Sequence, residues 1–180
     1  MEKTAIRKIT FRKAALCSAA AVTAAVALPQ LVHMLGRLTG TDALTGQILL
    51  PMYLPVLLLG FCAGPAAGAA AGIVSPLFSF ALTGMPAPSQ LGIMTAELFC
   101  YGLFAGLFAS LRVNPALKAL AASASARLLR LAVTAAAVLI FKTDGLSLSG
   151  TLYILALGLP GMALHTVAAA YFIKKTGVGE

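Results

Sequence analysis

Long apolar stretches with few charges constrain this chain more than any other feature. Runs of about 20 apolar residues are the length that an α-helix needs to cross ~30 Å of hydrocarbon. Charged residues make up 10% of the 180-residue chain, and its mean hydropathy is +0.96. A water-soluble domain of this size exposes much of its chain and needs more surface charge. The sequence therefore predicts an all-α integral membrane protein.

We expect one membrane domain, over residues 1–180, with six transmembrane helices. Four apolar runs are clear, and the stretch from Ile48 to Leu82 is too long for one helix. Gly64-Pro65 near the middle of that stretch is a dipeptide that turns the chain, so we divide it into two spans. The expected spans are residues 14–35, 48–62, 65–82, 91–111, 123–141 and 152–173.

The basic residues predict the orientation of these spans. Six spans place both termini on one side, and Lys and Arg collect on the cytoplasmic side. Only Arg37 and Lys142 fall on the other side. The basic residues on the side of the termini are Lys3, Arg7, Lys8, Arg12, Lys13, Arg112, Lys118, Arg127, Arg130, Lys174 and Lys175. We therefore expect cytoplasmic N- and C-termini, and a basic excess that reports topology rather than nucleic-acid binding.

The N-terminal region also fits a second interpretation. A basic stretch, an apolar stretch and Ala25-Val26-Ala27 resemble a cleavable signal peptide. Cleavage would leave five spans and spoil the charge balance, so we expect the first helix to stay.

Motifs for catalysis and metal binding are absent from the sequence. It has no phosphate-binding loop that ends in Gly-Lys-Ser/Thr, no Gly-x-Ser-x-Gly nucleophile elbow, and no His-Glu-x-x-His pair around His33 or His165. Cys17, Cys62 and Cys100 lie in apolar stretches without zinc or redox spacing. We expect no enzyme, no cofactor and no metal site.

One acidic residue lies within a predicted span. Glu97 is about six residues into the fourth helix, roughly 9 Å below its outer end. A carboxylate at that depth is costly and is a functional-site candidate by default. Tyr101 lies one turn further along the same face. His165 follows the Gly158-Leu159-Pro160-Gly161 break at a depth of about 20 Å, and whether it reaches Glu97 stays open.

Small residues indicate where helices approach closely. Gly64, Gly68 and Gly72 form one stripe, Gly102 and Gly106 form another, and both are expected to pack within the protein. In the first helix, four-residue spacing relates Ala15 to Ala19, Ala20 to Ala24, and Ala21 to Ala25. More than one face of this helix is therefore flat, which suits either internal packing or docking of a partner.

Several motifs together resemble a known family. They are Leu49-Leu50-Pro51-Met52-Tyr53-Leu54-Pro55 and the apolar run after it, Gly64-Pro65, Ser75-Pro76-Leu77, Thr83-Gly84-Met85-Pro86, and Glu97 followed by Tyr101-Gly102. The chain resembles the substrate-binding S components of energy-coupling factor (ECF) transporters, which take up vitamins. The likeness runs from about His33 to Gly106 and continues weakly through Arg127–Arg130 to Leu159-Pro160-Gly161.

The resemblance implies a six-helix bundle in a prokaryotic plasma membrane. Such a bundle captures a small water-soluble vitamin or related micronutrient at its outer face. It then docks onto a transmembrane coupling subunit with two cytoplasmic ATPases. The implied docking residues are Ala15, Ala19, Ala20 and Ala24. The absence of a phosphate-binding loop agrees with ATP hydrolysis by partner subunits.

The resemblance also implies which residues bind the substrate. Glu97, Tyr101 and His165 are the first candidates, and Gln47, Tyr53 and Ser79 are weaker ones. Gln30 and His33 are expected at the outer mouth of the first helix. The chain departs from the family in having Met52-Tyr53 where a Met-His pair is expected, and His165 where Gln is more usual. These departures leave the identity of the substrate open.

Two other functions remain possible from the sequence. A metal-ion uptake component would use His33, His165, Glu97 and a cysteine, since borderline metals favour imidazole and carboxylate. A non-transporting membrane scaffold would have the flat first helix as its main functional feature.

Overall fold

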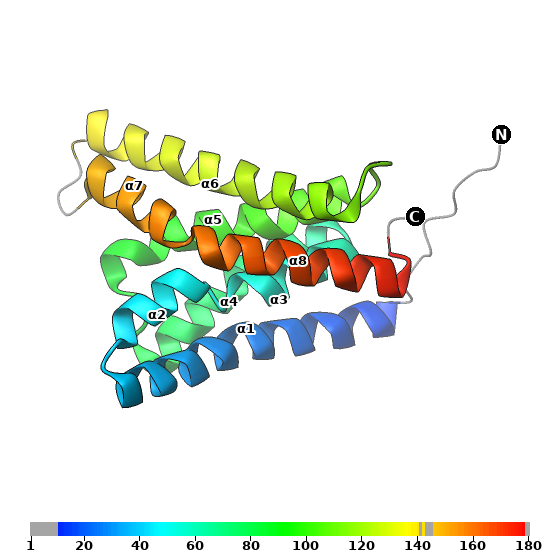
Figure 1. The fold of residues 1–180 in the computed structure, drawn as a ribbon, viewed down its shortest axis with the longest axis horizontal. Coiled ribbons are helices and arrows are strands. Elements are labelled where there is room, and N and C mark those ends of the chain that lie inside the picture. Colours follow the sequence, from blue (N-terminus) through cyan, green and yellow to red (C-terminus); the bar gives the residue numbers. More distant parts are fainter. Residues whose placement is uncertain (1–10, 141, 143–145, 179–180) are drawn as a thin grey trace.

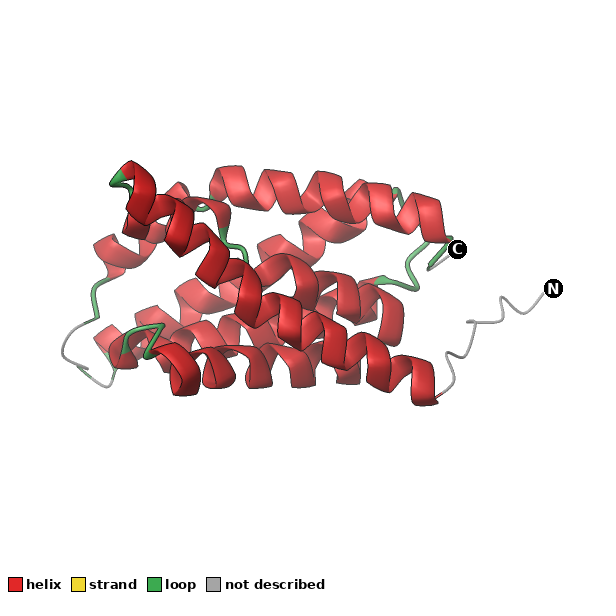
Figure 2. Ribbon diagram, turned by 90° about the horizontal axis from the view of Figure 1, so that it is seen from below, coloured by secondary structure: helices red, strands yellow, loops and turns green. Residues whose placement is uncertain are grey.

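The computed structural model describes residues 11–140, 142 and 146–178. These residues form helices joined by short connections, without strands among them (Figure 2). The helices are α1 (Phe11–Thr39), α2 (Asp42–Leu49), α3 (Tyr53–Ala63), α4 (Pro65–Thr83), α5 (Pro88–Phe108), α6 (Pro115–Leu139), α7 (Leu148–Leu157) and α8 (Leu159–Thr176). The predicted all-α class is confirmed for this part of the chain.

The helices are long and apolar enough for a multi-pass membrane protein. Five described segments could each cross a membrane, and the pair α7 and α8 would be a sixth if it counts as one span. Large apolar side chains such as Leu16, Phe78 and Leu128 are exposed on the outside of the bundle. Such a surface suits hydrocarbon, because lipid does not penalise exposed apolar groups as water does.

Two of the predicted spans are broken helices. The span predicted at 48–62 is divided between α2 and α3, and Pro51 in the break lacks the N–H that would continue α2. Leu50 before it takes a left-handed conformation with φ of 48°. The span predicted at 152–173 is divided at Gly158, where α7 and α8 are bent by 46°.

Helix α6 begins at Pro115, eight residues before the predicted span at 123–141. Asn114 caps it by accepting a hydrogen bond from the backbone N–H of Ala116, and Pro115 suits the first helical position. Arg127 and Arg130 therefore lie well inside the helix, and each is only 7% exposed. The prediction counted both among the charges that flank a cytoplasmic connection, and their position deep in α6 removes them from that count.

The remaining basic residues still favour one end of the bundle. Figure 1 shows the start of α1, the start of α6 and the end of α8 at one end, and α2 and the start of α7 at the other. We call the latter the α2 end. Lys174 and Lys175 lie at the far end from α2. Three residues of the predicted group, Lys3, Arg7 and Lys8, lie outside the described residues.

Helix α3 is the centre of the bundle. It packs against α1, α4, α5 and α8, and Val56, Leu57 and Phe61 on different faces of it are all buried. An apolar helix without a polar face is expected in such a place. The helix carries Tyr53 at its first turn, so the rigid centre of the bundle positions that side chain.

The glycine stripes bring three helices into backbone contact. A methyl group at Gly102 of α5 would overlap the carbonyl of Gly68 of α4, and one at Gly60 of α3 would overlap the carbonyl of Gly102. A methyl group at Gly72 would overlap the carbonyl of Leu98. The prediction that these stripes pack within the protein is confirmed, and α5 is held in a fixed position against α3 and α4.

Candidate functional site: a pocket at the α2 end

A pocket of about 340 Å³ opens at the α2 end. Its walls come from α1, the α2–α3 break, the end of α4 with the Met85-Pro86 connection, the first turns of α5, Arg130 of α6 and Ile154 of α7. This volume lies at the small end of the range of small-molecule sites. All six candidate spans, with the pair α7 and α8 taken as one, thus contribute residues to one cavity.

The lining of the pocket is mainly apolar and nearly uncharged, with a small number of amide groups. Three carboxamides line it, from Gln30, Gln47 and Gln90, and each can both donate and accept hydrogen bonds. Thioethers from Met52, Met85 and Met94 add adaptable apolar surface. Among the described lining residues, Arg130 is the one with a permanent charge.

Contacts between α1 and its neighbours shape one wall. The imidazole of His33 packs against Gly46 of α2, where an added methyl group would lie 3.0 Å from the ring Cε1 atom. The Gln30 amide donates a hydrogen bond of 3.4 Å to Thr83 Oγ1. Thr83 Oγ1 in turn donates to the Ser79 carbonyl at 2.7 Å. These bonds fix α1 against the end of α4.

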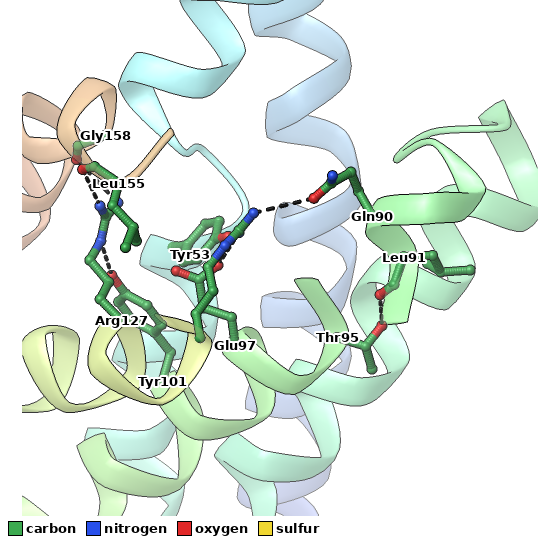
Figure 3. Close-up of polar contacts among 10 residues, drawn as sticks. Tyr53, Gln90, Leu91, Thr95, Glu97, Tyr101, Arg127, Leu155 and Gly158 are labelled. Carbon is green, nitrogen blue, oxygen red and sulfur yellow. Dashed lines mark hydrogen bonds and ion pairs between the residues drawn. The ribbon is translucent and has the colours of Figure 1, made fainter. Parts of the chain in front are cut away.

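A buried ion pair forms the floor of the pocket. Tyr53 Oη donates a 2.7 Å hydrogen bond to Glu97 Oε2, and the guanidinium of Arg130 pairs with the same oxygen (Figure 3). Glu97 is 1% exposed and Tyr53 is 2% exposed. Because Glu97 is the tenth residue of α5, it lies about 14 Å from the start of that helix. A carboxylate at this depth requires such a partner.

Arg130 also reaches toward the pocket mouth. A second guanidinium nitrogen, Nη2, donates to Gln90 Oε1 at 3.3 Å, a long hydrogen bond (Figure 3). Its Nε is buried and has no hydrogen-bond partner among the described residues. The guanidinium is thus paired on one side with a carboxylate and on the other only with a neutral amide.

A second arginine connects the floor to the α7–α8 bend. Tyr53 and Tyr101 meet edge to face, with ring centroids 4.9 Å apart. Arg127 Nε donates to Tyr101 Oη at 3.1 Å, while its other nitrogens donate to the carbonyls of Leu155 at 2.7 Å and Gly158 at 3.2 Å. Arg127 therefore binds two carbonyls at the break between α7 and α8, and that of Gly158 also accepts from the backbone N–H of Met162 at 3.0 Å.

His165 does not join Glu97. It is buried against α2, where its ring interacts with the backbone of Leu49, and no described residue forms a hydrogen bond with its Nδ1. Gly161, one turn earlier in α8, allows the close approach, because a methyl group there would overlap the carbonyl of Ile48.

The structure divides the predicted binding residues into three groups. His33, Gln47, Tyr53 and Ser79 line the pocket. Glu97 and Tyr101 lie beneath it and contact Tyr53. His165 lies apart from both groups. Two of the three first candidates, Glu97 and Tyr101, therefore lie beneath the pocket, and the weaker candidates Gln47, Tyr53 and Ser79 form part of its walls.

Sequence reasoning missed Arg130 and Gln90 as members of the site. Arg130 falls within the span predicted at 123–141, but it was counted with the basic residues of the cytoplasmic side. The helix-start signal Asn114-Pro115 sets the beginning of α6 two turns earlier, which places Arg130 roughly 22 Å from that beginning. Gln90 was placed in the connection before the helix, whereas it belongs to the first turn of α5.

The predicted docking residues lie on the least buried helix. Ala15 and Ala20 are exposed and Ala24 is half-buried. Ala19 borders a shallow groove of about 290 Å³ between α1 and α4. Part of the small-residue surface of α1 thus faces α4, and part faces outward.

The residues of the metal hypothesis are not brought together. Among the described residues, no three His, Cys, Asp or Glu side chains lie close enough to hold a metal ion. The carboxylate of Glu97 is already engaged by Tyr53 and Arg130.

Fold and site together define a helical bundle of the multi-pass membrane type, with a small pocket at one end above a buried ion pair. No protein-family model, no curated protein and no solved structure matches the chain.

Proposed function

We propose that this protein is the substrate-binding membrane subunit of an ECF-type transporter, the S component. It captures a small water-soluble vitamin or related micronutrient for uptake. The observation that carries the proposal is the pocket of about 340 Å³ at the α2 end, with three carboxamides in its walls and an ion pair in its floor. Specificity follows from those groups, because a wrong ligand leaves buried polar atoms unpaired.

The orientation belongs to the same proposal. The pocket faces the cell exterior of a prokaryotic plasma membrane, and the end of α8 with Lys174 and Lys175 faces the cytoplasm. The basic residues away from the pocket support this orientation.

Energy and partners complete the proposal. The sequence lacks an ATP-binding loop of its own, so ATP hydrolysis belongs to two cytoplasmic ATPases and a transmembrane coupling subunit. The outward surface of α1 around Ala15 and Ala20 is the docking surface for the coupling subunit, since small exposed residues allow a second helix to approach closely.

The test is native mass spectrometry of the protein purified in mild detergent after growth in rich medium. We expect a bound molecule of vitamin size that dissociates at a defined mass. The molecule should be lost in Arg130→Lys, which keeps the charge but not the forked geometry, and retained in Lys174→Gln, an exposed residue at the far end. A folded parent protein without any bound molecule would contradict high-affinity capture.

A further inference from the structure

The state of Arg130 carries information about the ligand. The side chain is 7% exposed and lines the pocket. Within the part of the chain that the structure describes, its Nε has no hydrogen-bond partner, and its Nη2 donates a long hydrogen bond to Gln90. Burial of a guanidinium with unpaired N–H donors costs free energy, because each such donor gives up its hydrogen bond to water and gains none in return. A ligand acceptor that reaches Arg130 would make better hydrogen bonds than Gln90 does.

The charges in direct contact with the pocket are already balanced, and Arg127, whose guanidinium is engaged by Tyr101 and by two backbone carbonyls, lies outside the lining. Arg130 is neutralised by Glu97 in direct contact, and no other described lining residue has a permanent charge. An anionic ligand would add an uncompensated charge to a buried neutral pair, and a cationic ligand would lie against the guanidinium. Both arrangements are penalised in a low-dielectric site.

Gln90, which accepts the hydrogen bond from Arg130 Nη2, shows which chemistry fits beside this guanidinium. Gln90 presents an uncharged carboxamide oxygen, and it is half-buried in the first turn of α5. Gln30 and Gln47 offer further amide donors and acceptors across the pocket. Methionines beside them, Met52 and Met94, suit the faces of a flat ring.

We propose, resting on the proposed function, that the substrate is uncharged at neutral pH and presents a carbonyl oxygen or ring nitrogen to Arg130, in place of the Gln90 side chain. The substrate class is therefore a neutral amide or heterocycle rather than a carboxylate, a phosphate ester or an amine. Gln90 occupies the position of the substrate acceptor when the pocket is empty.

The charge of the substrate is tested with the small-molecule fraction of yeast extract. Ion exchange at neutral pH separates this fraction into uncharged, anionic and cationic pools, and each pool is added to the purified protein in detergent. We expect the uncharged pool to give the largest rise in the unfolding temperature, about 5 °C. A largest rise with either charged pool would overturn the inference and leave the proposed function standing. No rise with any pool would contradict the proposed function itself.

The displacement of Gln90 is tested with a matched pair of variants that leave Arg130 and Glu97 intact. Gln90→Ala removes the competing acceptor. We expect the uncharged pool to give half of its maximal rise in the unfolding temperature at a dilution about threefold greater than for the parent. In Gln90→Glu the carboxylate is tethered beside Arg130 and, as residue 90 is half-exposed, it stays partly hydrated while it engages the guanidinium, so we expect the rise in unfolding temperature to be lost. Weaker or unchanged binding in Gln90→Ala, or unchanged binding in Gln90→Glu, would overturn the displacement.

Discussion

At the scale of single residues, the floor of the pocket explains how a carboxylate is accommodated deep in an apolar helix. Glu97 meets the hydroxyl of Tyr53 and the guanidinium of Arg130, so its charge is paired and hydrogen-bonded. A buried pair of this kind contributes little net stability compared with apolar residues, but removal of one partner leaves an uncompensated charge. The ion pair therefore acts as a unit rather than as two separate residues.

The first prediction concerns this unit. Glu97→Ala should lower the free energy of unfolding by about 3–5 kcal/mol, because Arg130 is left buried and unpaired. The double variant with Arg130→Met should be less destabilised than Glu97→Ala alone. The measurement is the folded fraction in detergent mixtures with increasing sodium dodecyl sulfate. Tyr53→Phe, which keeps the ion pair, is the control and should cost about 1.5–3 kcal/mol. A double variant that costs the sum of the single variants would contradict the pairing.

At the scale of helices, backbone contact fixes α5 between α3 and α4. The carbonyls of Gly68 and Gly102 occupy the space that a side chain would need. Lipid provides no hydrophobic drive between helices, so the stability of this arrangement comes from close packing. The same contact determines how far Glu97, further toward the α2 end of α5, lies from Tyr53 of α3.

The second prediction compares two glycines of α5. Gly102→Ala should lower the free energy of unfolding by about 1–3 kcal/mol, because the new methyl group overlaps backbone that cannot move easily. Gly92→Ala should be neutral or stabilising by up to about 1 kcal/mol, since nothing lies within 4 Å of the new methyl group and alanine favours helix. Thermal unfolding in detergent measures both. Equal effects would show that the close contact carries no stability.

At the scale of the whole molecule, two broken helices give the pocket its walls. The α2–α3 break turns Leu50, Pro51 and Met52 toward the cavity, and Arg127 ties the α7–α8 bend to Tyr101 beside the floor. Continuous helices at these two places would fill the space with regular backbone. The pocket is thus a property of the assembled bundle rather than of one segment.

The third prediction concerns how the bundle crosses the membrane. In a chain with Cys17, Cys62 and Cys100 replaced by Ala, a membrane-impermeant thiol reagent applied to intact cells should label Ser149→Cys. Ser149 lies in the first turn of α7, at the α2 end. Thr176→Cys, at the end of α8, should react only after the cells are opened. Labelling of both positions from one side, or the reverse pattern, would contradict an outward-facing pocket.

Much of the fold was predictable from the sequence, because its determinants are local. Apolar runs of sufficient length, the Gly64-Pro65 turn and the four-residue glycine spacing predicted the membrane class, the division between α3 and α4, and the packing stripes. Glu97 was recognisable as special from its depth alone.

The tertiary structure decided what the sequence left open. The partners of Glu97 come from residues 44 positions before it and 33 positions after it, and no local pattern relates such distant side chains. Arg130 was counted with the basic residues of the cytoplasmic side, whereas the capped start of α6 at Pro115 places it deep inside the bundle. His165 was separated from Glu97 because α8 packs against α2 through Gly161. A sequence specifies which segments are apolar and where they turn, but only their packing specifies which polar groups meet.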